Sequence, residues 1–121
     1  MDKFVKEIFD TLVKILPSDW GKIVLHLELG KNNHSFLFFV SDKCAGKYYS
    51  FADLQRLGIF SKIEFQNVSM RIGNVSRAFQ QTFEKKWMGY TLVISRDGMS
   101  YVDFEQQATM ISNHWKEKYL N

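Results

Sequence analysis

The sequence predicts an α+β domain in which an antiparallel sheet of about five strands packs against one long helix and two shorter helices. Two observations predict this class. Segments that are apolar at steps of three or four residues occur along the chain with segments that are apolar at every second residue. Their order is α-βββ-α-ββ-α, and adjacent strands joined by short turns favour antiparallel pairing. With 121 residues, the chain is predicted to form a single domain, 1–121.

The first element is an amphipathic helix over residues 2–16. Pairs of opposite charge at i and i+4 mark its polar side, and Pro17 ends it because proline cannot continue a helix. Its opposite side is apolar and carries Phe4, Val5, Ile8, Leu12, Ile15 and Leu16.

Three strands follow and form an antiparallel meander. Residues 22–29 alternate between apolar and polar side chains, as in a strand with one buried face. Residues 35–40 are apolar on both faces, which predicts a central strand that is covered on both sides, at least in part. The third strand spans residues 47–51. Residues 52–60 are less regular and allow one helical turn that stops at Gly58.

The long helix is predicted over residues 62–86. Ser61 and Glu64 form a capping-box pattern at its start, and Lys85 and Lys86 suit a helix C-terminus. Its apolar stripe consists of Phe65, Val68, Ile72, Val75, Phe79 and Phe83. Such a stripe needs a broad apolar surface, so we expect this helix to lie across the sheet.

The last part of the chain is predicted to be a hairpin and a helix. Residues 88–94 and 99–104 are two strands, and Asp97-Gly98 between them is a strong turn signal because both residues tolerate positive φ. Residues 106–120 are predicted to form the final helix, with one apolar side that carries Ala108, Ile111, Trp115 and Tyr119.

Composition excludes several classes of protein. The net charge of +3 is small, and the basic residues are scattered rather than gathered in the stripe of a dedicated nucleic-acid binder. A single cysteine excludes an internal disulfide and a cysteine-based zinc box, and we expect no metal and no cofactor. The N-terminal helix is charged throughout, and no apolar run approaches 18 residues. The expectation is therefore a cytoplasmic domain that does not bind a membrane.

Two alternative functions have candidate residues. His26 and Glu28 share the polar face of a strand and could act as an acid–base pair, while Asp103 and Glu105 suit a two-carboxylate or metal site. Solvation of strand faces and strand ends explains all four residues as well. A small nucleic-acid-binding module is the second alternative. In that case bases would stack on Phe36, Phe38, Phe39, Tyr48 and Tyr49, near Arg71, Arg77, Lys85 and Lys86.

Three segments together resemble a known family. The first is I-L-P-S-D-W-G-K-I-V-L-H-L-E-L at residues 15–29. The second is Trp87 followed by Y-T-L-V-I-S-R-D-G at residues 90–98 and by Asp103-Phe104. The third is W-K-E-K-Y-L at residues 115–120. Their order and spacing resemble the YezG-like family of bacterial antitoxin or immunity proteins.

This resemblance implies a non-enzymatic inhibitor. Such a protein binds a cognate toxin in a one-to-one complex, often a nuclease from a contact-dependent growth inhibition or other polymorphic toxin system. Nuclease active sites are commonly basic, so acidic side chains on strands or loops are natural contacts, with aromatic side chains as anchors. The predicted partner-binding residues are Glu28, Asp42, Tyr48, Tyr49, Phe51, Asp53 and Asp97.

Overall fold

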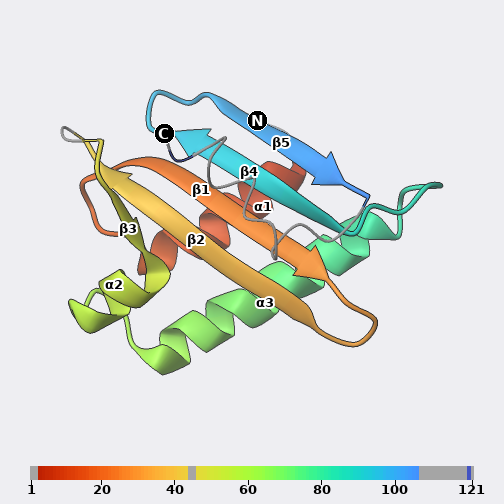
Figure 1. Cartoon of the computed structure of the whole chain (residues 1–121), viewed down its shortest axis with the longest axis horizontal. Helices are drawn as coiled ribbons and strands as arrows, with labels where there is room; N and C mark the ends of the chain where they lie inside the picture. The colour runs from red at the N-terminus through yellow and green to blue at the C-terminus, as the bar shows by residue number, and fades with distance from the viewer. Residues whose placement is uncertain (1–2, 44–45, 107–119, 121) are drawn as a thin grey trace.

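The computed structural model describes residues 3–43, 46–106 and 120. Within these residues it confirms the predicted α+β class with one five-stranded antiparallel sheet (Figure 1). The strands are β1 (Trp20–Leu29), β2 (His34–Asp42), β3 (Tyr48–Ser50), β4 (Gly89–Ser95) and β5 (Ser100–Glu105), in the order β3-β2-β1-β4-β5. The helices are α1 (Lys3–Leu12), continued by a 3₁₀ turn over Val13–Ile15, α2 (Phe51–Arg56) and α3 (Lys62–Gln80).

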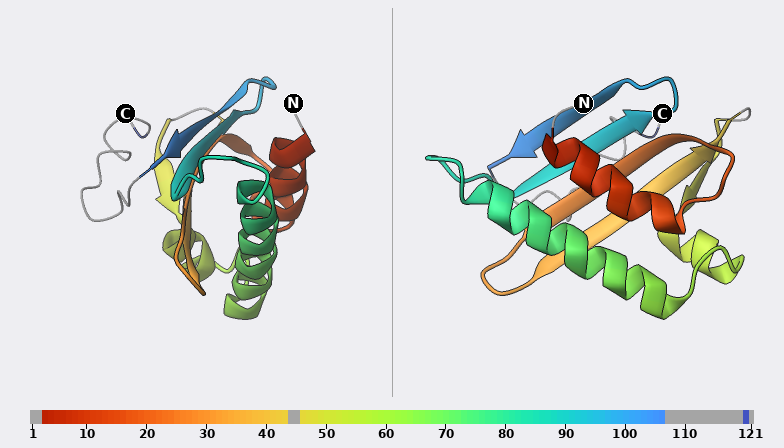
Figure 2. Two further views of the ribbon diagram at one scale, coloured as in Figure 1. Left: turned by 90° about the vertical axis from the view of Figure 1, so that its right-hand side faces the viewer. Right: turned by 180° about the vertical axis from the view of Figure 1, so that it is seen from behind.

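Helices α1 and α3 lie side by side on one face of the sheet (Figure 2). Alternation along β1 sends Ile23, Leu25 and Leu27 to this face, where all three are completely buried. The two helices meet through Phe4 and Phe79, whose rings stack with centroids 4.1 Å apart. The main core therefore lies between this helix layer and the sheet.

The opposite face of the sheet has a second, smaller apolar cluster. Val24 of β1 and Val93 of β4 are buried there, directly opposite each other in the β1–β4 register. Leu37 and Phe39 of β2 pack against them from the neighbouring strand, as does Leu120 near the C-terminus. These contacts support the prediction that β2 is covered on both sides in part, because Phe36, Phe38 and Val40 of the same strand enter the main core.

Helix α3 begins as predicted and ends earlier than predicted. Ser61 accepts a hydrogen bond from the Glu64 amide (3.1 Å), and the Glu64 carboxylate accepts one from the Ser61 amide (2.8 Å), which completes the capping box. The helix stops at Gln80 rather than at residue 86. The Gln80 side chain instead donates to the carbonyl of Trp87 (2.6 Å) and holds the irregular segment that leads into β4.

Other element boundaries also differ from the predictions. β1 starts at Trp20 and β2 continues to Asp42, while β3 has only three residues. Phe51 belongs to α2, because Ser50 caps that helix by accepting from the Asp53 amide (3.2 Å). The final helix predicted over residues 106–120 falls in a stretch of which the structure describes only the two end residues. No helix among the described residues is long and apolar enough to cross a membrane.

Candidate functional site

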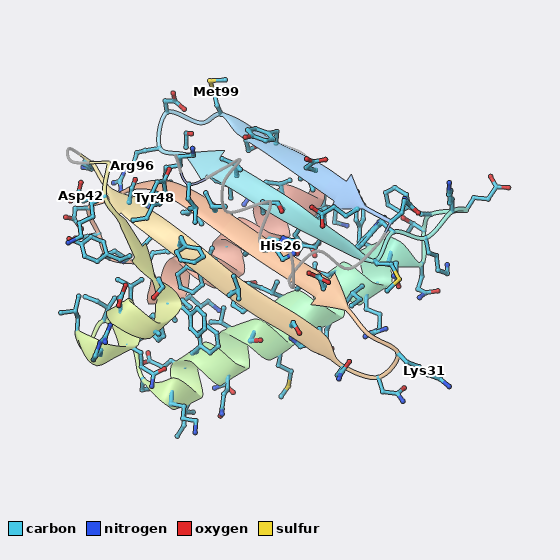
Figure 3. The ribbon with its side chains drawn as sticks, viewed as in Figure 1. His26, Lys31, Asp42, Tyr48, Arg96 and Met99 are labelled. Carbon is cyan, nitrogen blue, oxygen red and sulfur yellow. The ribbon has the colours of Figure 1, made fainter. Side chains whose placement is uncertain are left out.

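Three of the predicted partner-binding residues meet at one end of the sheet. Asp42, Tyr48 and Asp97 line an open hollow of about 760 Å³. Register brings them together, because Asp42 at the end of β2 pairs with Trp20, and Lys22 on β1 pairs with Ser95 just before the β4–β5 turn. Figure 3 shows Asp42, Tyr48 and Arg96 at this end, far from Lys31 in the β1–β2 turn.

A close backbone approach shapes this end of the sheet. The β1–β2 register shifts between Trp20 and Lys22, so Gly21 sits at an irregularity in the strand pair. A Cβ atom on Gly21 would lie 2.5 Å from the Asp42 carbonyl oxygen, which no side chain tolerates without movement. The Gly21 carbonyl also accepts the Arg96 amide (2.9 Å). Glycine at this position therefore lets the end of β2 approach the start of β1.

Arg96 is a structural residue of this site that sequence reasoning missed. Its Nη1 donates to the carbonyl oxygens of Ser18 (2.9 Å) and Trp20 (3.0 Å), and its guanidinium lies 5.0 Å from the centroid of the Trp20 ring. These contacts fasten the β4–β5 turn to the loop before β1. In the turn itself, Asp97 accepts the Met99 amide (3.0 Å). No local pattern could reveal the Arg96 contacts, since they join parts of the chain more than seventy residues apart.

The charge at this end is mixed rather than acidic. Lys22, Lys43 and Arg96 line the same hollow as the two predicted carboxylates. The Lys22 ammonium lies 5.9 Å from the centroid of the Tyr48 ring, a distance at which a cation is attracted to an aromatic face. This hollow therefore presents both positive and negative groups beside an aromatic ring.

Tyr49 belongs to a second hollow next to the first. Because neighbouring residues of a strand point to opposite faces, Tyr48 packs on the smaller apolar cluster while Tyr49 packs on the main core. Tyr49 lines a hollow of about 200 Å³ between α2 and the loop before β1. Asp42 lines both hollows, so the two hollows adjoin at this end of the sheet and together include four predicted residues (Asp42, Tyr48, Tyr49 and Asp97). We call the two adjoining hollows the sheet-end surface.

The other three predicted residues lie apart from this surface or within the fold. Glu28 is near the opposite end of β1, paired with Ser35 and Gly89. Phe51 packs on the core, with its ring 4.8 Å from that of Phe65. Asp53 serves the start of α2: its carboxylate accepts the Ser50 amide (3.1 Å), and this hydrogen bond is the main reason that its pKa is lowered.

The predicted acid–base pair does form, although its imidazole is inaccessible. The Nε2 atom of His26 lies 2.9 Å from a Glu28 carboxylate oxygen, and Nδ1 lies 2.8 Å from the Thr91 hydroxyl. His26 and Thr91 are both completely buried. A general base must reach the proton that it removes, so this buried arrangement favours a structural role. The residues that the structure describes include no group of three His, Cys, Asp or Glu side chains that could hold a metal ion.

The aromatic residues proposed for base stacking are divided between the two faces. Phe36 and Phe38 are buried on the face that α1 and α3 cover, so neither ring is open to a base. Phe39 and Tyr48 lie on the other face, and Tyr49 points to the first. A stacking platform needs several exposed rings on one surface, and these residues do not provide it.

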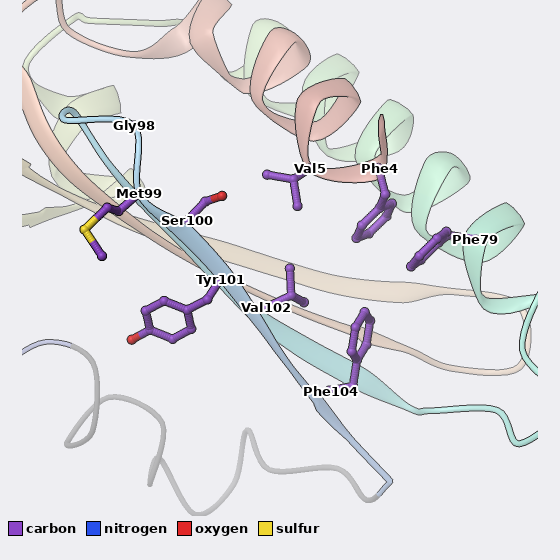
Figure 4. Close-up of a pocket in the computed structure, with 9 residues that line it drawn as sticks. All are labelled: Phe4, Val5, Phe79, Gly98, Met99, Ser100, Tyr101, Val102 and Phe104. Atoms are coloured by element: carbon purple, nitrogen blue, oxygen red, sulfur yellow. The ribbon is translucent and has the colours of Figure 1, made fainter. Parts of the chain in front are cut away.

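A third hollow lies between β5 and the ends of α1 and α3 (Figure 4). It measures about 600 Å³, and its inner wall consists of the core residues Phe4, Phe79, Val102 and Phe104. The Tyr101 ring points away from these rings, on the other side of the strand. No predicted partner-binding residue lines this hollow, and its lining offers apolar contact without a carboxylate, imidazole or basic group.

Comparison with known proteins identifies the family. The family model described as "Immunity protein YezG-like" matches residues 1–120. The chain belongs to the YezG-like immunity protein family. No curated protein matches the sequence significantly. Trp20 and Trp87, two of the residues that carry the resemblance, are 9% and 1% exposed, so both pack in the core of this fold.

Membership in the YezG-like family supports the role of an immunity protein, which has a toxin as its partner. An inhibitor of this kind requires a rigid binding surface and no catalytic machinery of its own. Hydrogen bonds from Arg96 and the close approach at Gly21 hold the segments of the sheet-end surface together.

Proposed function

We propose that this YezG-like protein binds a cognate bacterial toxin in a one-to-one complex and neutralises it by occluding the active site. The toxin is a nuclease of a contact-dependent growth inhibition or other polymorphic toxin system, and the protein acts in the cytoplasm without enzymatic activity. The observation that carries this proposal is the family match over residues 1–120.

The sheet-end surface is the proposed contact with the toxin. Tyr48 and Tyr49 supply rings that are each half-buried, so they can bury further area without a large loss of side-chain entropy. Asp42 and Asp97 supply carboxylates that complement the basic groups of a nuclease. Glu28, Phe51 and Asp53 are not part of this proposed surface, because each is engaged elsewhere in the fold.

Co-expression with the toxin encoded by the neighbouring gene tests the function. We expect a co-purifying one-to-one complex and protection of the host cell. If the purified protein carries no toxin with it and the host cell is not protected, the proposal is refuted.

Substitutions in the sheet-end surface test the contact. Tyr48→Ala and Asp97→Asn should each weaken toxin binding at least about tenfold, which corresponds to ~1.4 kcal/mol of binding free energy. Lys31→Ala, at the far end of the sheet, is the matched control and should bind like the wild type. Isothermal titration calorimetry gives the affinities, and equal values for all four proteins would show that the toxin binds elsewhere.

A further inference from the structure

The hollow beside α2 has a different chemistry from its larger neighbour. Most of the residues that line it are apolar, and both charged residues that line it are acidic. The apolar lining is Pro17, Val40, Leu54, Leu57 and Ile59 together with the ring of Tyr49, and the acidic residues are Asp19 and Asp42. We call it the α2 hollow. The larger hollow, by contrast, is lined by three basic side chains as well as two carboxylates.

The turn after α2 positions two of the apolar residues. Gly58 has φ +79°, and its amide donates to the Gln55 carbonyl (3.0 Å), while the Ile59 amide donates to the Leu54 carbonyl (3.0 Å). This pair of hydrogen bonds is the Schellman motif that closes many helices. Leu57 and Ile59 therefore flank a turn whose backbone is fixed by hydrogen bonds and by a glycine.

These two side chains are more exposed than large apolar residues usually are. Leu57 is 66% exposed and Ile59 is 43% exposed, although Leu54 beside them is buried. Apolar side chains gathered around a hollow and left open to water mark a contact site. The carboxylates of the hollow determine which group fits, because an apolar wall next to two acids suits a long side chain with a cationic end.

We propose that the α2 hollow is a socket for a basic side chain of the partner, with arginine preferred. The methylene stem would lie against Leu57 and Ile59, and the guanidinium would meet Asp19 and Asp42. Arginine is preferred because its planar fork matches carboxylates in pairs of hydrogen bonds. This inference rests on the proposed function, since it places in the toxin the arginine that enters the socket.

The socket itself can be tested without the toxin. N-acetyl-arginine amide is titrated into the protein while NMR follows the methyl groups of Leu54, Leu57 and Ile59, and N-acetyl-citrulline amide serves as the uncharged control of the same shape. We expect saturable shifts with the arginine compound only, with a dissociation constant on the order of 1 mM for so small a ligand. Equal responses to the two compounds, or no saturable response, would overturn the proposal.

Three variants locate the binding. The double variant Asp19→Asn, Asp42→Asn should lose the arginine response, because it removes both charges and keeps the side-chain shapes. Leu57→Ser should weaken the response several-fold, whereas Ile63→Ser should leave it unchanged. Ile63 is the appropriate control because it is 69% exposed and does not line the hollow. A response that survives the double Asn variant would overturn the proposal.

The same variants separate the socket from the proposed function. If the toxin binds the wild type and the double Asn variant equally well, the socket is refuted and the immunity function stands. If the arginine compound binds as expected but the toxin forms no complex, the socket is supported and the immunity function is refuted. At least about tenfold weaker toxin binding by the double Asn variant, with normal binding by Ile63→Ser, supports both.

Discussion

Tyr90 is a buried polar residue that connects α3 to the sheet. It is completely buried on β4, and its hydroxyl lies 2.7 Å from that of Ser76, which itself donates to the Ile72 carbonyl (2.7 Å). Burial raises the pKa of Tyr90 well above its ordinary value of 10.0, because the phenolate would lose its hydration. The hydrogen bond between the Ser76 and Tyr90 hydroxyls offsets this rise in pKa only in part.

The raised pKa of Tyr90 predicts a loss of stability in alkaline solution. Above about pH 10 the tyrosine ionises in the unfolded chain but not in the folded one, so the free energy of unfolding falls by up to ~1.4 kcal/mol per pH unit. Tyr90→Phe should remove this contribution, at a cost of about 1 kcal/mol at neutral pH. Urea unfolding at pH 7 and above pH 10 measures both effects. Tyr101→Phe, at a half-exposed site, should show the same dependence of the free energy of unfolding on pH as the wild type. The same dependence in Tyr90→Phe would contradict the prediction.

Arg96 offers a second prediction at the level of one side chain. Arg96→Gln loses the cation–π contact with Trp20 and the hydrogen bonds to the Ser18 and Trp20 carbonyls. We expect a loss of about 1–2 kcal/mol in the free energy of unfolding, measured by chemical denaturation. Lys85→Gln, at an exposed site in the segment after α3, should change stability by less than about 0.5 kcal/mol. A wild-type free energy of unfolding for Arg96→Gln would show that these contacts do not stabilise the turn.

At the scale of single elements, α3 depends on its capping box. Ser61→Ala removes the acceptor for the Glu64 amide and should cost about 1 kcal/mol in the free energy of unfolding. Ser61→Asp should retain most of the stability, because aspartate accepts the same hydrogen bond and suits the positive end of the helix dipole. Denaturant titration compares the three proteins, and equal losses in both variants would argue against a capping effect.

The end of α3 shows how packing overrides periodicity. Phe83 continues the apolar stripe at the expected spacing, although the helix has already ended at Gln80. Its ring contacts those of Phe79 (5.1 Å), Trp87 (6.1 Å) and Phe104 (5.6 Å), with distances given between centroids. Aromatic contacts with β5 therefore keep Phe83 against the core without a helical backbone.

At the scale of the whole molecule, Ile72 tests the role of α3 as the helix that covers the sheet. It is completely buried within the main core. Ile72→Asp places an unpaired charge there and should unfold the domain, since the cost of several kcal/mol is comparable to total stability. Ile63→Asp, on the exposed side of the same helix, should remain folded. Thermal melting followed by circular dichroism distinguishes them, and a cooperative transition in Ile72→Asp would contradict this account.

The proposed binding surface is also a property of the whole molecule. Asp42, Tyr48 and Asp97 lie in three separate segments, and pairing of β2 with β1 and of β1 with β4 brings them to one hollow. The same register carries Glu28 toward the opposite end of the sheet. Strand pairing also brings the basic residues Lys22, Lys43 and Arg96 to this hollow. The mixed charge of the hollow could therefore not be predicted from the net charge of the chain.

The amino-acid sequence by itself determined the features that depend on short-range interactions. Periods of two and of three to four residues identified the strands and the helices α1 and α3, Ser61 and Glu64 identified the start of α3, and Asp97-Gly98 identified the last hairpin. The family resemblance followed from the order of such segments. Apart from the order of the segments, each of these features depends on residues that are only a few positions apart in the sequence.

Only the tertiary structure decided which side chains meet. It separated Tyr48 from Tyr49 on two faces, buried His26 with Thr91, and brought Arg96 to the loop before β1. It also placed Leu57 and Ile59 beside Asp19 and Asp42 in the α2 hollow. The physical reason is that strand register and helix packing join residues distant in sequence, and those contacts depend on how all the elements fit together.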